Sequence, residues 1–380
     1  MRMAVDGSNG DIENYILRAM KTAQNDVLPT NDVLPIEYRK LQVTGGSTFI
    51  VSLPKPWIRD HGLERGTVVG VQSLPTGELR ITPTEVKPVR RSAVVDLDHL
   101  PGHALYDFLI GLYVSGADAI SVRKRKGMGP QERRIIRSFL RDTRGMEVGE
   151  DSEDGMDILS LLKPSELSLQ VSLNRMYLLV TSIVEDAATY LNDGVEEPLD
   201  DLEERERQID ARRLLIDRQV AMALESPNIE RTLGVTRLQA VEHLAMARAL
   251  ERMGDHARSF ANIVLNHREG LNPALISEPR RHLDVWLGSL RTVIRNIYVK
   301  DVNHVIDAKR ELEQSIEALE AFEEGIIEHG KGNQNNSVIL FRFTEKIRRL
   351  CAYTIDLSET QINMVMGALV GIDASRSETL

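Results

Sequence analysis

The chain contains little cysteine and no long hydrophobic run. Its single cysteine, Cys351, excludes an intramolecular disulfide framework and a structural zinc site built from several thiolates. We therefore expect a cytoplasmic protein. No apolar run approaches the roughly 20 residues that a membrane-spanning helix needs, and the chain does not open with the charged and then apolar pattern of a signal peptide. Both absences predict that no segment inserts into a membrane.

Motifs of common enzyme classes are also missing. The sequence has no Gly-rich phosphate loop of the Walker type and no Gly-x-Gly-x-x-Gly segment after a strand. A di-iron helical bundle carries Glu-x-x-His on two helices, and the nearest approach here is a single Asp-Val-Asn-His over residues 301–304. These absences predict that the protein is not an enzyme, and they count against a carboxylate-bridged metalloenzyme.

The remaining composition is that of an ordinary globular protein with an uneven charge. Of the 380 residues, 42% are hydrophobic and 27% are charged, and at roughly 150 residues per domain we expect two or three domains. The formal net charge is −10. Residues 36–92 carry +4 and residues 93–145 carry +3, whereas residues 1–35 carry −2 and residues 146–380 carry −15. A basic front joined to an acidic back indicates two functions in one chain.

The first part of the chain divides into a leader, a β-rich module and an α/β unit. Residues 1–35 contain the near-tandem copies Asn-Asp-Val-Leu-Pro, and each proline disfavours helix before it, so we expect an extended leader. Residues 36–92 hold short Val-, Ile- and Thr-rich runs broken by glycine and proline, which predicts a small β module with a short helix near 56–61. In residues 93–163 strand and helix patterns alternate, which predicts a small α/β connecting unit.

From about residue 164 the pattern is purely helical. One apolar stripe steps by four and three residues through Leu169, Leu173, Met176, Val180, Ile183, Ala187 and Tyr190. Two further helices are expected near 199–224 and 237–266. The region from 280 onward repeats this plan, with a break at Gly330-Lys-Gly332, and a shift of 97 residues places Leu250 on Ile347. The sequence therefore predicts two tandem three-helix repeats, over 164–270 and 278–373.

Two pairs of carboxylates lie four residues apart in the first helical repeat. Glu251 and Asp255 belong to the segment Glu-Arg-Met-Gly-Asp-His, and Glu206 and Asp210 have the same spacing on the preceding helix. On a helix, carboxylates at this spacing point from one face and can share a hard cation. Pairs on neighbouring helices are how bundles assemble carboxylate metal sites. The pattern is compatible with a metal site.

A second interpretation of the same residues stays open. One stripe of the third helix steps by three and four residues through Arg248, Glu251, Asp255, Arg258 and Asn262, which also fits a solvated row of ion pairs. His256 falls on the neighbouring face, where we expect a surface or packing residue rather than a metal ligand. The lone Cys351 is expected to be a small buried residue.

Cations flank the strands and the short helix of the β module. They are Arg39, Lys40, Lys55 and Arg59. A basic face on a small β unit can bind the DNA backbone, because each cation that neutralises a phosphate releases condensed counterions. The basic run over residues 123–126 can contact phosphate as well, although a solvated loop is the favoured interpretation.

Three stretches resemble known families. Residues 39–57, Arg-Lys-Leu-Gln-Val-Thr-Gly-Gly-Ser-Thr-Phe-Ile-Val-Ser-Leu-Pro-Lys-Pro-Trp, resemble a SpoVT/AbrB-type DNA-binding domain, together with Gly62-Leu63, Gly66 and the segment 79–83. The core Thr-Gly-Gly-Ser-Thr with Ser-Leu-Pro-Lys is similar to the archaeal version. Residues 251–257, Glu-Arg-Met-Gly-Asp-His-Ala, resemble the signature of PhoU domains, which are built from two three-helix repeats. The α/β segment resembles the connecting region of archaeal proteins that join both domains.

The resemblance covers about 36–372 and implies a phosphate-uptake regulator. In AbrB-like proteins two chains interleave their hairpins, so it implies a homodimer with a swapped-hairpin β module, whose four basic residues named above contact DNA. PhoU proteins bind multinuclear metal through Glu-x-x-x-Asp pairs, which here implies Glu251 with Asp255 and a divalent or ferric ion such as iron, zinc or magnesium. The implied function is transcriptional regulation, expected to be negative, of phosphate transport genes.

The second repeat departs from the PhoU pattern. The 97-residue shift places Arg348 on Glu251 and Ala352 on Asp255. This repeat has therefore lost both carboxylates and gained a cation, so the chain keeps at most one metal cluster. Arg348 can instead neutralise a neighbouring carboxylate.

The expected architecture is multidomain: a small β module, an α/β connecting unit and an all-α pair of tandem three-helix bundles. The first hypothesis is a DNA-binding regulator whose acidic helical half senses phosphate status. The alternative is an adaptor that does not bind DNA and regulates a phosphate ABC-transporter ATPase or a sensor kinase by protein–protein contact. In that case the β module serves only for dimerisation.

Overall fold

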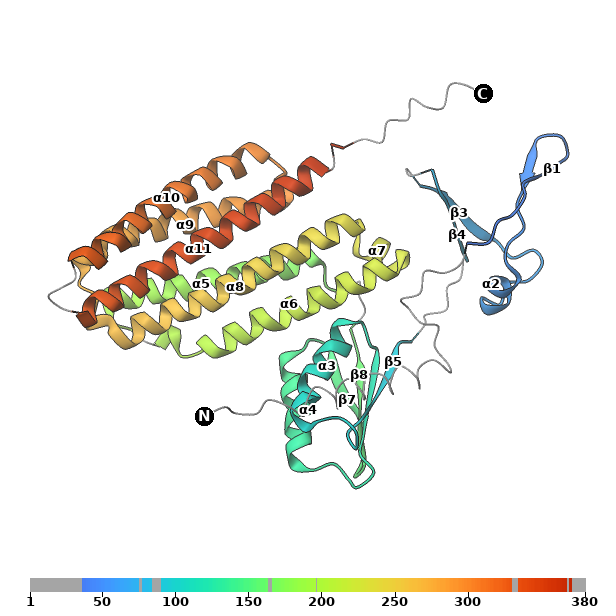
Figure 1. Cartoon of the computed structure of the whole chain (residues 1–380), viewed down its shortest axis with the longest axis horizontal. Coiled ribbons are helices and arrows are strands. Elements are labelled where there is room, and N and C mark those ends of the chain that lie inside the picture. The colour runs from blue at the N-terminus through green and yellow to red at the C-terminus, as the bar shows by residue number, and fades with distance from the viewer. Residues whose placement is uncertain are drawn as a thin grey trace, which may run out of the picture. The chain divides into compact units, whose positions relative to one another are not determined.

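The computed structural model describes residues 36–74, 77–83, 90–162, 166–195, 197–329, 334–367 and 369–370. The β module and the segment Arg91–Val370 belong to separate compact units (Figure 1). The leader expected over residues 1–35 and the break expected at Gly330-Lys-Gly332 lie outside the described residues.

The β module consists of two hairpins with a short helix between them. Strands β1 (Gln42–Thr44) and β2 (Thr48–Ile50) pair antiparallel, α2 (Lys55–Asp60) follows, and β3 (Val69–Ser73) pairs antiparallel with β4 (Leu79–Pro83). The first turn passes through Gly45 and Gly46, whose φ angles are 63° and 88°. Glycine adopts this left-handed conformation without strain, which is why the Gly-Gly pair lies at the hairpin tip. The sequence pattern did not reveal β1.

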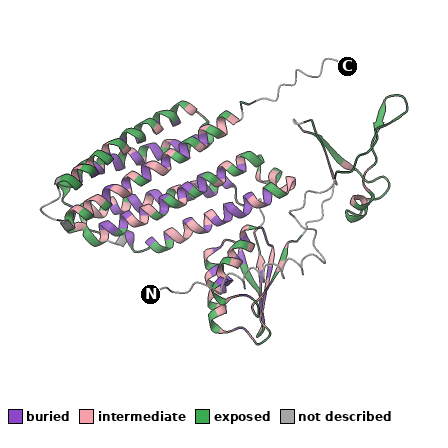
Figure 2. Ribbon diagram, viewed as in Figure 1, coloured by how far each residue is buried: buried purple, intermediate pink, exposed green. Residues whose placement is uncertain are grey.

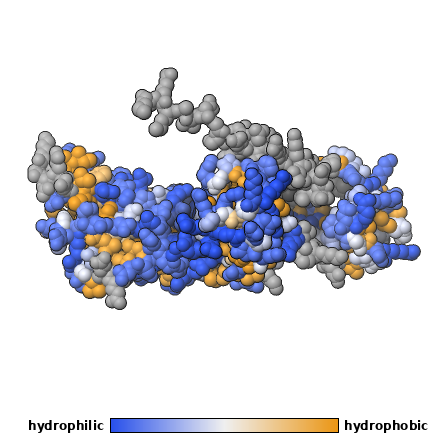
Figure 3. Space-filling view, turned by 90° about the horizontal axis from the view of Figure 1, so that it is seen from below, coloured by the Kyte–Doolittle hydropathy of each residue, from blue (hydrophilic) through white to orange (hydrophobic). Residues whose placement is uncertain are grey.

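No described residue between 36 and 83 is buried, so the module has no hydrophobic core of its own (Figure 2). Its large apolar side chains are instead exposed; they include Ile36, Tyr38, Leu41, Val43, Phe49, Ile50, Val51, Val71 and Leu79. At the right of Figure 3, apolar residues of the module lie at the surface among hydrophilic ones. Two isolated two-stranded sheets without a covered apolar face are marginally stable at best.

The α/β unit is a four-stranded sheet with two helices on the same side (Figure 1). Its elements in chain order are β5 (Ser92–Asp96), α3 (Leu105–Val114), β6 (Ala119–Arg123), α4 (Pro130–Asp142), β7 (Met146–Asp151) and β8 (Gly155–Ser160). The strand order is β5-β6-β8-β7, with β5 parallel to β6 and the other pairs antiparallel. The rings of Tyr113 and Phe139 join α3 to α4 edge to face, 6.3 Å apart. The alternation predicted from the sequence is confirmed, except that β7 was not foreseen.

The helical region contains the two predicted three-helix repeats. The first repeat consists of α5 (Leu169–Asp193), α6 (Leu202–Glu225) and α8 (Arg237–His267), with the short α7 (Pro227–Leu233) before α8. The second consists of α9 (Pro273–Val299), α10 (Val302–His329) and α11 (Gln334–Gly367). The α5 stripe is buried from Leu169 to Ala187, as its spacing predicted. No helix in the described part of the chain is long and apolar enough to cross a bilayer.

Both repeats share one hydrophobic core. Their third helices, α8 and α11, lie against each other (Figure 1). The rings of Phe260 and Phe343 meet at 5.0 Å across this contact. The residues that the 97-residue shift equates, such as Leu250 and Ile347, are both fully buried. The internal repeat is therefore a repeat of buried positions.

Candidate functional site

The four basic residues expected to contact DNA are all exposed and lie on two segments. Arg39 and Lys40 precede β1, and Arg39 pairs with Glu37. Lys55 and Arg59 lie four residues apart on α2, so they share one face of that helix. The structure thus brings Lys55 and Arg59 together and leaves Arg39 and Lys40 on a separate, preceding segment.

Local contacts fix the short helix that carries two of these cations. Pro54 and Pro56 flank its first residue, where proline is well tolerated. At its end His61 lies 5.1 Å from the ring of Trp57, with a ring nitrogen 2.8 Å from the Trp57 carbonyl oxygen. The backbone N–H of Leu63 donates a hydrogen bond of 2.9 Å to the carbonyl oxygen of Ile58. Trp57 and Ile58 are half-buried by these contacts, while Lys55 and Arg59 face solvent.

The second candidate site is a carboxylate cluster between α6 and α8, which pack against each other. Glu206 and Asp210 lie on α6, and Glu251 and Asp255 lie on α8. Burial, together with the negative charges of the other three carboxylates, raises the pKa of Asp210 to about 6. Burial and the charge of Asp255 likewise raise the pKa of Glu251. The tertiary structure therefore brings both predicted pairs into one electrostatic cluster.

A glycine allows these two helices to approach closely. Gly254 lies between Glu251 and Asp255 on α8, and a Cβ atom added there would lie 3.0 Å from Cδ1 of Ile209 on α6. Such a contact is tighter than ordinary packing. The glycine of the Glu-Arg-Met-Gly-Asp-His segment thus places the carboxylates of α8 opposite those of α6.

Two arginines flank the cluster: Arg258, which belongs to the charged stripe of α8 described above, and Arg213, which the sequence analysis did not single out. Arg258 pairs with Glu206 across the two helices. Arg213 donates to Asp217 at 2.6 Å and its Nε lies 3.8 Å from Glu251. The four-residue spacing of Arg213 and Asp217 on one helix was the signal that could have revealed that pair. Ion pairs of this region therefore join α6 to α8.

The cluster as it stands does not form a ligand cage for a metal ion. In the described ranges, no group of three His, Cys, Asp or Glu side chains is arranged to hold a metal. Glu206 is already paired with Arg258, and the raised pKa of Asp210 shows that its surroundings disfavour the ionised carboxylate. Binding of iron, zinc or magnesium by these residues stays a prediction, and it requires Arg258 to release Glu206.

In the second repeat the equivalent position carries an ion pair. Nε of Arg348 lies 3.1 Å from both carboxylate oxygens of the buried Glu323, and Nη1 lies 3.6 Å from Glu320. The prediction that Arg348 neutralises a neighbouring carboxylate is confirmed.

Three other predictions concern residues outside the cluster. His256 stacks on Tyr353 of α11 with 5.4 Å between ring centres, so it packs between helices as expected. Cys351 is fully buried, and burial raises the pKa of its thiol to about 12. In the basic run 123–126, Arg123 pairs with Asp157 at 2.6 Å and Lys124 with Glu132 at 2.5 Å. These pairs favour the solvated loop over a phosphate contact.

Two family models match the chain, whereas no curated protein and no solved structure does. The PhoU domain model matches residues 173–264, which contain all four clustered carboxylates. The model described as antidote-toxin recognition MazE, bacterial antitoxin, matches residues 42–90, which contain β1 to β4 and two of the four cations, Lys55 and Arg59. The chain therefore joins a MazE/AbrB-like module to a PhoU domain, the architecture that its sequence predicted.

Proposed function

We propose that this protein is a DNA-binding transcriptional regulator of phosphate uptake, a negative regulator that acts as a homodimer in the cytoplasm. The match to a PhoU domain supports a role in phosphate homeostasis. The match to a MazE/AbrB-like module supports DNA binding and oligomerisation. The helical half, which carries most of the negative charge, serves as the part that senses phosphate status or docks a partner.

The observation that carries this proposal is the β module without a core. Its apolar side chains are exposed, with Phe49 at 68%. A second copy of the module can cover them, which supplies the buried apolar surface that two isolated hairpins lack. The cations of both copies then belong to one β unit. Its double set of exposed cations suits the DNA backbone, because phosphate contacts supply most of the affinity of a DNA-binding protein.

DNA binding is tested by electrophoretic shift assays with DNA from phosphate-transport promoters. We expect the full chain to bind at low salt, with an affinity that falls steeply as salt rises. Arg39→Ala with Lys55→Ala is expected to abolish the shift. Arg291→Ala with Arg349→Ala, which removes two exposed arginines of the helical region, serves as the matched control. Absence of binding at low salt, or a basic-pair variant that binds like the control, contradicts the proposal.

Dimerisation is tested separately by light scattering of the full chain. Phe49→Asp places a charge on a side chain that is exposed in the single copy, so it costs little unless a second copy covers it. We expect this variant to be monomeric and Leu275→Asp, at an exposed apolar position of α9, to remain dimeric. A dimer that is unaffected by Phe49→Asp contradicts the role assigned to the module.

The second candidate function is an adaptor that regulates a phosphate-transporter ATPase or a sensor kinase through the helical half. The charge of −15 over residues 146–380 favours it, because DNA repels an acidic surface. Recovery of transporter components in a pull-down from nuclease-treated lysate favours the adaptor. DNA footprints that depend on Lys55 count against it.

A further inference from the structure

Three arginines from distant parts of the chain act on one another electrostatically where the α/β unit contacts the first helical repeat; Arg144 and Arg212 are half-buried there, and Arg175 is exposed. Arg144 lies between α4 and β7, Arg175 lies on α5, and Arg212 lies on α6. Burial, together with the positive charges of Arg144 and Arg175, lowers the pKa of Arg212 to about 10. Arg212 nevertheless remains protonated at neutral pH, so the cluster carries three positive charges.

These arginines lack the partners that other arginines of the same region have. Nε of Arg144 and Nε of Arg212 are buried and have no hydrogen-bond partner in the part of the chain that the structure describes. The charges that act on Arg212 there are both positive. By contrast, Arg205 on the same helix binds Asp186 at 2.6 Å, and Arg91 binds Glu225 at 2.7 Å. Buried donors without acceptors and like charges without counter-ions are both costly.

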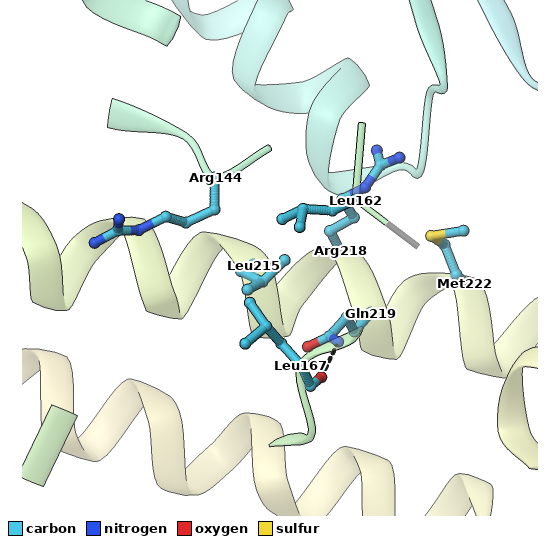
Figure 4. Close-up of a pocket in the computed structure, with 7 residues that line it drawn as sticks. All are labelled: Arg144, Leu162, Leu167, Leu215, Arg218, Gln219 and Met222. Carbon is cyan, nitrogen blue, oxygen red and sulfur yellow. Dashed lines mark hydrogen bonds between the residues drawn. The ribbon is translucent and has the colours of Figure 1, made fainter. Parts of the chain in front are cut away.

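The neighbouring contacts hold this region in place. Arg218, only 5% exposed, donates to the carbonyl oxygens of Tyr113 and Ala117 at the end of α3, at 2.8 and 2.9 Å. Gln219 donates to the carbonyl oxygen of Leu167 at 2.7 Å (Figure 4). The α/β unit and the start of α5 are thereby tied to α6 at one end of the contact.

Arg144 extends from this fixed region toward the preceding part of α6. Its side chain lines a shallow hollow, open to solvent, together with Leu215 and Arg218. In Figure 4 the guanidinium of Arg218 turns toward α3, whereas that of Arg144 points away from both Arg218 and Leu215. Among the described residues, the hydrogen bonds that tie α6 to the end of α3 and to the start of α5 come from Arg218 and Gln219, and the charged end of Arg144 makes none of them.

We propose that Arg144, Arg175 and Arg212 bind a phosphate-type oxyanion where the α/β unit meets α5 and α6. The planar guanidinium offers paired N–H donors that match the oxygens of a tetrahedral anion. A dianion supplies acceptors to the buried Nε atoms and offsets the repulsion among three cations. Because each arginine comes from a different element, the anion links the α/β unit to the first repeat. This inference deepens the proposed role in phosphate homeostasis and rests on it only for the choice of phosphate as ligand.

The test is calorimetric titration of the full chain with inorganic phosphate, pyrophosphate, sulfate and chloride at constant ionic strength. We expect saturable binding of phosphate and sulfate by the wild type. The affinity should be weaker by roughly tenfold or more in Arg212→Gln and in Arg144→Gln, since each variant loses a charged hydrogen bond. Arg349→Gln is the control, because Arg349 is exposed and pairs with Glu345 at 3.0 Å in the second repeat. Preference for phosphate supports a free ion as ligand, and preference for pyrophosphate supports the phosphoryl group of a larger molecule. Equal binding by the wild type and the Arg212 and Arg144 variants overturns the site, as does an equal response to chloride.

A second measurement distinguishes ligand binding from a structural role. In the absence of phosphate and at low salt, Arg212→Gln is expected to unfold at the same temperature as the wild type or at a higher one, because repulsion is removed. Added phosphate should raise the unfolding temperature of the wild type only. A lower unfolding temperature of the variant without phosphate, together with an equal rise on adding phosphate, contradicts the proposal. DNA binding of the variants is scored separately, so failure of this site leaves the shift assay, and hence the proposed function, unaffected.

Discussion

The two helical repeats share a fold and differ in the charges at equivalent positions. Each sets its third helix against its second helix, α8 on α6 and α11 on α10. Where repeat one has Glu251 beside Asp210, repeat two has Arg348 bound to Glu323. The same backbone thus accommodates clustered carboxylates or a closed ion pair. Packing of apolar stripes determines the fold, and the charged positions are free to take on another role.

The two repeats also differ at an uncharged residue that lies between these charged positions on the third helix. Gly254 on α8 corresponds to Cys351 on α11 by the 97-residue shift, and both are buried. Repeat two accommodates a side chain where repeat one has none, because Ile209 occupies the space beside Gly254. The glycine of repeat one therefore accompanies the clustering of its carboxylates.

The largest effect is expected from removing the ion pair of repeat two. Arg348→Ala leaves the buried Glu323 without its cation and should lower the free energy of unfolding by about 3 kcal/mol. Urea unfolding followed by circular dichroism of the helices measures the change. Arg349→Ala removes a neighbouring exposed arginine and should change stability by less than about 0.5 kcal/mol. Equal effects of the two substitutions on the free energy of unfolding would show that the ion pair of Arg348 with Glu323 does not stabilise the fold.

Making repeat one resemble repeat two at the glycine should have the next largest effect. Gly254→Cys forces a side chain against Ile209 and is expected to cost about 2 kcal/mol of stability. Combining it with Ile209→Ala, which makes room, should cost less than the sum of the two single changes. Urea unfolding of the single and double variants provides the measurement. Strict additivity would mean that these two residues do not oppose each other.

The carboxylate cluster predicts a pH dependence that repeat two lacks. The folded pKa of Asp210, about 6, lies above its ordinary value of 3.8. Its contribution to stability is therefore present below about pH 4 and lost as the pH rises through about 6. Asp210→Asn should stabilise chelator-treated protein by about 1 kcal/mol at pH 7.5, after allowance for partial exposure, and by less at pH 5.

The control for this pH dependence is Asp307→Asn, which changes an exposed carboxylate of α10. It should leave the stability difference between pH 5 and pH 7.5 as in the wild type. Urea unfolding curves at pH 5 and pH 7.5 measure this difference. A pH profile of Asp210→Asn that coincides with that of the wild type would contradict the clustering.

The smallest effect is expected for metal binding. Arg258→Ala frees Glu206 and should increase the uptake of added zinc or iron, whereas Glu251→Ala with Asp255→Ala should decrease it. Elemental analysis after dialysis measures both changes. Equal, near-zero content in the wild type and in both variants would remove the metal site.

Regular apolar spacing made the helical half predictable in advance. The α5 stripe, the bounds of α6 and α8 and the 97-residue repeat all follow from residues that are close in sequence. The short strands β1 and β7 were not predicted. β1 is three exposed residues and β7 is largely exposed, so neither shows a clear alternation of apolar and polar residues. The paired carboxylates were visible because helical spacing places them on one face.

The sequence by itself determined the order of modules, the helical periodicity and the polarity of charge along the chain, since these depend on neighbouring residues and on composition. Only the tertiary structure decided which charges meet. Arg348 pairs with Glu323 and Arg258 pairs with Glu206. The charges that lower the pKa of Arg212 are those of Arg144 and Arg175, two arginines from other elements. The partners of each group lie on different elements, so their distances depend on how helices pack and not on spacing along the chain. Electrostatic energy follows those distances and the burial around them.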